Sequence, residues 1–171
     1  NSNYSLSGLV LSELPTISKT SGAYDSKDVV GTGTPAAQNV SVTLAAGDFA
    51  EVAGFTKNNY NLPVTAAVTG AIGTITRKGL TAGLTSTITH IYHRTALAAF
   101  LARTSSALTG LVLSELPAVS KTSGAYDSKD VVGANEPEAQ NVSVTLASGD
   151  FSEDAGFKRN NYNLPDGKSG A

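Results

Sequence analysis

The sequence predicts an all-β fold of two tandem small β modules, each either sandwich-like or an extended sheet. Thr, Ser, Ala, Gly and Val dominate the 171 residues, while Cys, Met and Trp are absent. Such a composition favours short strands and turns over helices. Segments that alternate apolar and polar residues are separated by turn-forming clusters, which is typical of short strands. A long internal repeat also divides the chain into two similar parts.

The repeat aligns residues 8–63 with residues 110–165 without a gap, at an offset of 102 (110 − 8). Of the 56 aligned positions 45 are identical, so each copy is a structural unit. The repeat predicts a first module over residues 1–79, without its N-terminal strand, and a second over residues 80–171, without its C-terminal strands. We therefore expect one sheet edge of the second module to be open, or to be filled by a neighbouring chain.

The expected strands follow in chain order. Residues 14–24 alternate loosely, and residues 40–44 alternate strictly between apolar and polar, the pattern of a half-buried strand. Residues 59–78 are rich in Val, Ile and Thr and predict two more strands. Residues 84–92 alternate strictly again and predict a strand that joins the modules.

Residues 94–105 depart from the β pattern. They are rich in Ala and Leu, and Leu97, Phe100 and Leu101 stand at helical spacing. The spacing predicts a short helix near residues 95–104, with a strand as the alternative.

Three segments together resemble a known family. They are YDSKDVVGTG at residues 24–33, NNYNLP at 58–63 and ITRKGLT at 75–81. Together they resemble the YDG-type repeat modules of filamentous-haemagglutinin-like surface adhesins of Gram-negative bacteria, over nearly the whole chain. The resemblance implies β-rich spacer modules of a secreted protein, located outside the cell at the bacterial surface. The chain departs from the family pattern at residues 92–96, where YHRTA replaces a Tyr-Asp-Gly-Thr-Thr start.

Composition and motifs exclude several functional classes. A net charge of −2 with both signs scattered gives no nucleic-acid footprint. No run of about 18 apolar residues is present, so we expect no membrane insertion. Without cysteine the chain has no disulfide and no thiolate site. No nucleophile elbow or complete dinucleotide motif occurs, so we expect no catalytic residues, no cofactor and no enzyme activity.

The chain has two histidines, His90 and His93. On a strand, positions i and i+3 point to opposite faces, so the pair is poorly placed to hold one metal ion. We expect core or edge histidines, and no metal site here.

Acidic residues recur at the same positions in both copies. Carboxylates in extracellular arrays often bind calcium, which gives four calcium candidates: Asp25, Asp28, Asp127 and Asp130. The alternative is turn-forming Asp that accepts backbone N–H bonds. Lys27 lies between the first two carboxylates and opposes a cation, so the turn reading is favoured.

Two further sets of residues are binding or modification candidates. Tyr24 and Tyr126, in the same turn of each copy, are candidate contacts for a glycan or protein. Asn3, Asn39 and Asn141 match the Asn-x-Ser/Thr acceptor pattern for glycosylation.

The sequence therefore predicts a spacer region of a bacterial surface adhesin whose partners are adjacent repeats of the same chain. The alternative is a multivalent module that binds a host-surface glycan or protein, with one site in each repeat and strength from avidity.

Overall fold

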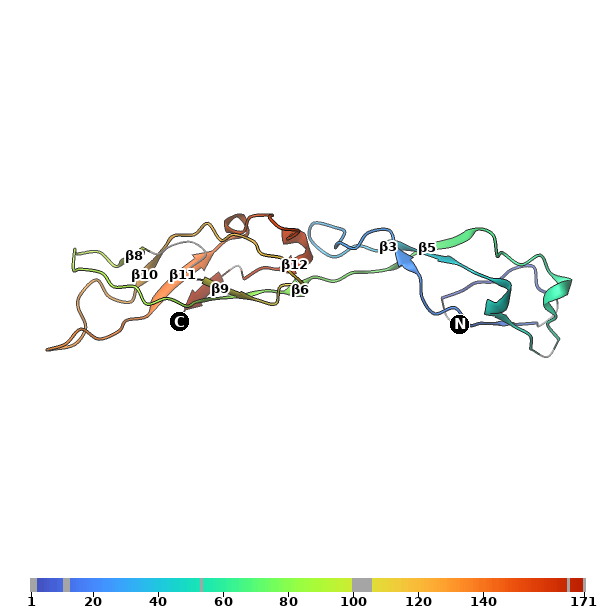
Figure 1. The fold of residues 1–171 in the computed structure, drawn as a ribbon, viewed down its shortest axis with the longest axis horizontal. Coiled ribbons are helices and arrows are strands. Elements are labelled where there is room, and N and C mark those ends of the chain that lie inside the picture. The colour runs from blue at the N-terminus through green and yellow to red at the C-terminus, as the bar shows by residue number, and fades with distance from the viewer. Residues whose placement is uncertain (1–2, 11–12, 53, 100–105, 166, 171) are drawn as a thin grey trace. The chain divides into compact units, whose positions relative to one another are not determined.

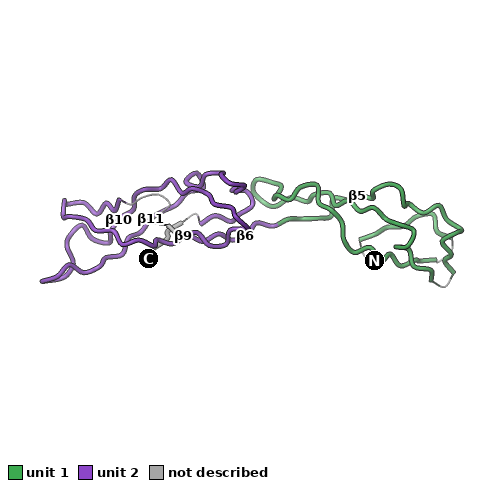
Figure 2. The backbone as a smooth tube through the Cα atoms, in the orientation of Figure 1, with its two compact units in different colours: residues 1–75 green, residues 76–171 purple. Residues whose placement is uncertain are grey.

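The computed structural model describes residues 3–10, 13–52, 54–99, 106–165 and 167–170. Within them the chain forms thirteen short strands and four single-turn 3₁₀ helices, which confirms the all-β prediction. The chain divides into two compact units, unit 1 (Asn1–Ile75) and unit 2 (Thr76–Ala171) (Figure 2). The repeat in the sequence predicted a division after residue 79.

Unit 1 is built on a three-stranded antiparallel sheet in the order β2-β3-β5, of which β3 and β5 are labelled in Figure 1. It also contains a separate antiparallel pair, β1 and β4. Val42 of β3 pairs with Val68 of β5, and Ala23 of β2 pairs with Ser41 of β3. Its elements are β1 (Thr16–Ile17), β2 (Ala23–Tyr24), β3 (Gln38–Thr43), η1 (Ala46–Asp48), β4 (Phe49–Ala50), η2 (Lys57–Asn59) and β5 (Ala67–Gly73).

Unit 2 contains a four-stranded antiparallel sheet in the order β13-β11-β10-β8 (Figure 1). Strands β7 and β9 form an antiparallel pair, and β6 and β12 form a parallel pair. Its elements are β6 (Lys78–Gly79), β7 (Thr81–Leu84), β8 (Leu97–Ala99), β9 (Ser106–Thr109), β10 (Ser123–Tyr126), β11 (Val142–Leu146), η3 (Ser148–Asp150), η4 (Arg159–Asn161), β12 (Tyr162–Asn163) and β13 (Gly167–Gly170).

The two units repeat one arrangement at the offset of 102. Strands β2 and β3 of unit 1 correspond to β10 and β11 of unit 2, and both pairs are antiparallel with the same register. The β1–β4 pairing of Ile17 with Phe49 returns as a bridge between Val119 and Phe151. Identical sequence therefore gives the same local pairing twice.

Each unit has its own apolar core around two phenylalanines. In unit 1 the buried core is Ile17, Leu44, Phe49 and Phe55. In unit 2 the equivalent positions are joined by further side chains, and the buried core is Leu80, Val119, Val144, Leu146, Phe151, Phe157 and Tyr162. Burial of these side chains is the main favourable term in the stability of each unit.

Two local predictions were wrong. Residues 97–99 form strand β8 rather than a helix, because their backbone pairs with β10; residues 100–104 lie outside the described part. The predicted strand over residues 84–92 stops at Leu84, where β7 ends, and residues 85–92 form no strand. The alternation there is real, but no partner strand pairs with it among the described residues.

The expected open edge of the second module is also corrected. Strand β13 pairs with β11 from Ser143 to Leu146 and occupies the place that β5 occupies beside β3 in unit 1. The edge beside β11 is therefore filled by the chain's own C-terminal residues.

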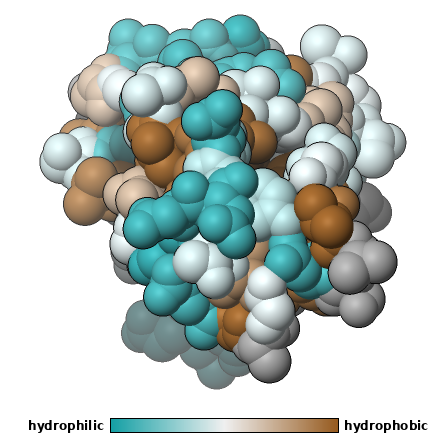
Figure 3. Space-filling view, turned by 90° about the vertical axis from the view of Figure 1, so that its right-hand side faces the viewer, coloured by the Kyte–Doolittle hydropathy of each residue, from teal (hydrophilic) through white to brown (hydrophobic). Residues whose placement is uncertain are grey.

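No helix among the described residues has the length and apolar character to span a bilayer. On the face drawn in Figure 3, hydrophobic residues lie between hydrophilic ones.

Candidate functional site

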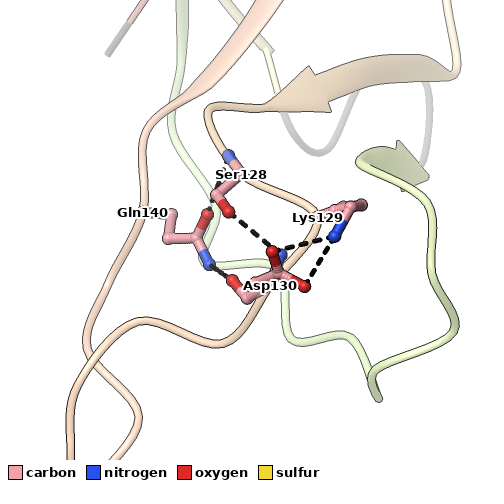
Figure 4. Close-up of polar contacts among 4 residues, drawn as sticks. All are labelled: Ser128, Lys129, Asp130 and Gln140. Carbon is pink, nitrogen blue, oxygen red and sulfur yellow. Dashed lines mark hydrogen bonds and ion pairs between the residues drawn. The ribbon is translucent and has the colours of Figure 1, made fainter.

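The loop between β10 and β11 carries Asp127 and Asp130, two of the four calcium candidates, and Asn141, one of the glycosylation candidates. It is held from inside by Gln140, whose amide nitrogen donates to the Asp130 carbonyl at 2.9 Å and whose amide oxygen accepts from the Ser128 N–H at 3.1 Å (Figure 4). The Asp130 N–H donates to Ser128 Oγ at 3.0 Å, and Lys129 Nζ lies 2.9 Å from both Asp130 carboxylate oxygens (Figure 4). Ser128, Lys129 and Asp130 therefore form a self-contained polar turn.

Unit 1 repeats this turn. The Asp28 N–H donates to Ser26 Oγ at 3.0 Å, and the Gln38 amide donates to the Asp28 carbonyl at 2.9 Å. Lys27 Nζ lies 3.5 Å from Asp28 Oδ1. Gln38 is buried, and its Oε1 has no partner among the described residues, unlike Oε1 of Gln140.

The four calcium candidates are engaged in this internal bonding. Asp25 accepts from the Asn39 amide at 2.9 Å, and Asp127 accepts from the Asn141 amide at 3.0 Å. Asp28 and Asp130 are paired with the neighbouring lysines. Among the described residues, no three His, Asp or Glu side chains gather in a way that would hold a metal ion. The four carboxylates thus bond side chains of their own loops.

The two candidate tyrosines differ between the units. Tyr24 is 45% exposed, and its ring lies against Gly73 of β5. Tyr126 is half-buried; its hydroxyl donates to the Ile88 carbonyl at 3.1 Å and its backbone N–H donates to the Ala96 carbonyl at 2.7 Å. Tyr126 therefore anchors residues 88–96, a role for which unit 1 has no described counterpart.

A hollow of about 530 Å³ lies in unit 2 between residues 84–95 and the loop at residues 126–142. His90 and His93 lie on its wall, exposed and stacked, with ring centroids 4.2 Å apart. The expectation of core or edge histidines on a strand was wrong, because residues 85–92 form no strand and both rings face one another. Tyr126 meets the His90 ring edge-on at 6.5 Å.

The three glycosylation candidates, Asn3, Asn39 and Asn141, are exposed. The amides of Asn39 and Asn141 already donate to aspartates of their own loops. Glycosylation stays a prediction.

A tyrosine–glutamate pair, repeated in both units, was missed by the sequence reasoning. Tyr60 donates to a Glu13 carboxylate oxygen and accepts from the Val10 N–H at 3.2 Å. In unit 2 Tyr162 donates to Glu115 and accepts from the Val112 N–H at 3.0 Å. The equal separation of 47 residues in both copies was the available signal.

These contacts raise the pKa values of both tyrosines. The hydrogen bond to Glu13 raises the pKa of Tyr60 above its usual value. Burial, followed by the hydrogen bond to Glu115, raises the pKa of Tyr162. Both tyrosines also stack on a phenylalanine, Tyr60 on Phe55 and Tyr162 on Phe157, at centroid distances of 5.2 and 5.0 Å. In unit 2 the pair thus joins residues 112–115 to the core through the buried Tyr162 ring.

No family model, curated protein or solved structure matches this chain.

Proposed function

We propose that this chain is a spacer region of a secreted bacterial surface adhesin, located outside the cell, whose units hold another part of the protein at a distance. The role is structural and requires no turnover. Its partners in this role are adjacent repeats of the same chain, because duplication of one unit adds length without a new fold.

The observation that carries the proposal is the use of the same polar residues in the same way in both units. The aspartates, the glutamine and the tyrosine–glutamate pair all form hydrogen bonds to other groups of their own unit. Residues placed for binding would instead direct free donors and acceptors outward. The resemblance to filamentous-haemagglutinin-like modules supports the surface location.

The test is to build chains with two, four and six copies of residues 64–165 and to measure their dimensions by small-angle X-ray scattering. For a spacer, the maximum dimension grows by a constant increment with each copy. Dimensions that grow as in a single compact globule would contradict the proposal.

A multivalent glycan- or protein-binding module is the second candidate, favoured by the exposed Tyr24 and by the hollow beside Tyr126. On a glycan array the spacer proposal expects no specific binding. Binding that is lost in a Tyr24→Ala, Tyr126→Phe double variant would favour this second function.

A further inference from the structure

The same core residues are better covered in unit 2 than in unit 1. Tyr162 is 3% exposed, whereas its counterpart Tyr60 is only half-buried. Val144 is buried, whereas its counterpart Val42 is half-buried. Because the four positions carry the same residue types, the difference must come from what packs on them.

Residues 77–84 supply the cover in unit 2. Strand β6 pairs with Tyr162 and Asn163 of β12, and the following Leu80 is buried in the core cluster, with its N–H donating to the Asn163 carbonyl at 3.0 Å. Arg77 holds Asn160, with Nε 3.0 Å from its carbonyl and Nη2 2.7 Å from its side-chain oxygen. Strand β7 then pairs with β9.

Residues 88–99 cover a second surface of unit 2, the outer edge of β10. Strand β8 pairs with residues 123–125, and the Ala98 side chain is completely buried there. The carbonyls of Ile88 and Ala96 accept the hydroxyl and the N–H of Tyr126. Residues 77–99 are thus one continuous segment that completes two edges of the unit.

The surface that receives this segment is present in unit 1 with the same sequence. SGAY at residues 123–126 returns as residues 21–24, and NNYN at residues 160–163 returns as residues 58–61. In unit 1 residues 21–24 are all exposed, and among the described residues no strand pairs with β2 on the side away from β3. Asn58, the counterpart of the asparagine held by Arg77, is also exposed.

Unit 1 also has a hollow beside this bare edge. Its volume is about 470 Å³, and its walls include Gly22 beside β2, Val42 of β3 and both Val68 and Ile72 of β5. Val68 and Ile72 are 42% and 63% exposed. Val68 and Ile72 lie on β5, on the far side of β3 from β2, so they belong to the face of the sheet. The outer edge of β2 is the edge with which an added strand can pair.

We propose that unit 1 is an acceptor for a strand segment with the sequence of residues 77–99, supplied by the linker of a preceding repeat in an array. The occupant follows from unit 2, where this segment lies on surfaces identical to the bare ones of unit 1. This inference rests on the proposed array, and it adds a mechanism: each linker is the structural complement of the repeat that follows it.

The test adds a copy of residues 76–102 in front of Asn1 of the full chain, which restores the repeat's own spacing. Hydrogen exchange is measured by mass spectrometry on peptides that cover residues 21–26 and 58–62. We expect exchange of these amides to slow at least about tenfold, while unit 2 is unchanged. Unchanged exchange in both peptides would overturn the proposal.

A matched variant carries Ala98→Pro and Leu80→Asp in the added copy alone. Proline removes a strand donor, and aspartate cannot enter the apolar core, so the protection should be lost. Protection that survives both changes would mean that the added residues act only as a tether, and would overturn the proposal. Protection that arises in the unextended chain as its concentration rises would identify a second copy as the occupant, with the same consequence.

The outcome is separable from that of the spacer test. If multi-copy chains fail to lengthen but the added segment protects unit 1, the spacer function fails and the acceptor stands. If the chains lengthen regularly while residues 21–26 exchange as before, the acceptor alone fails.

Discussion

Individual side chains in this protein connect a loop to the apolar core by packing and hydrogen bonds. Tyr162 illustrates the pattern: its ring is buried against Phe157, while its hydroxyl bonds Glu115 and the Val112 N–H. We expect removal of such a group to lower the stability of its unit.

Tyr162 makes unit 2 sensitive to alkali. Burial and the Glu115 bond raise the pKa of Tyr162 above the unfolded value of about 10. A raised folded pKa means that its contribution is complete below about pH 10 and is lost as the pH rises through the folded pKa. We expect wild-type stability to fall more steeply above pH 10 than that of Tyr162→Phe, measured by urea unfolding between pH 8 and 11. Parallel pH profiles for the two proteins would contradict this.

Gly133 is required by its backbone conformation. Its φ is +99°, and a Cβ there would collide with the Glu136 carbonyl oxygen. We expect Gly133→Ala to cost about 1–3 kcal/mol in unfolding free energy. The control is Gly149→Ala, where a Cβ would meet nothing within 4 Å and the change should stay within about 0.5 kcal/mol. Equal effects of the two variants would argue against a strained turn.

At the scale of elements, the 3₁₀ turns are stabilised by hydrogen bonds from individual side chains, because each turn is too short to be stable through its own backbone bonds. The 3₁₀ turn η3 depends on Asp150, whose Oδ2 accepts from the Ala147 N–H at 2.8 Å; Asp48 does the same for Ala45 at η1. In each turn the carboxylate of the third residue accepts from the backbone N–H of the N-cap residue, which is the reciprocal bond of a capping box.

Asp150→Ala removes this hydrogen bond and should therefore lower the stability of unit 2 by about 1 kcal/mol. Asp150→Asn retains an acceptor oxygen and should recover most of that loss. The stabilities of both variants are measured by chemical unfolding, with tyrosine fluorescence as the signal. The interpretation fails if Asn is as damaging as Ala.

Residues 97–99 show how an element is decided by its partner. Ala and Leu favour a helix there. The backbone groups of β10 are available beside them, and pairing with that edge outweighs a helical preference of a few tenths of a kcal/mol per residue.

At the scale of the whole molecule, the two units should differ in stability. Unit 2 buries Leu80, Val144 and Tyr162 in addition to the core positions that it shares with unit 1. We expect unit 1 to unfold first, in hydrogen exchange and in urea.

Matched core variants assign the two transitions. Phe55→Ala should lower the unfolding free energy of unit 1, seen in the first transition, and Phe157→Ala that of unit 2, seen in the second. Each loss should be about 3–5 kcal/mol, since both rings are almost fully buried. A single transition that both variants shift alike would show that the units unfold as one.

The sequence by itself determined the all-β class, the strand at β3 and the repetition of one arrangement at a spacing of 102 residues. It could do so because the alternation of β3 and the turn chemistry of its loops are local properties of the chain. Only the tertiary structure decided that residues 97–99 are a strand and that residues 77–99 complete unit 2. Those outcomes depend on backbone edges and apolar surfaces contributed by residues distant in sequence, and no local periodicity reports whether such a partner is present.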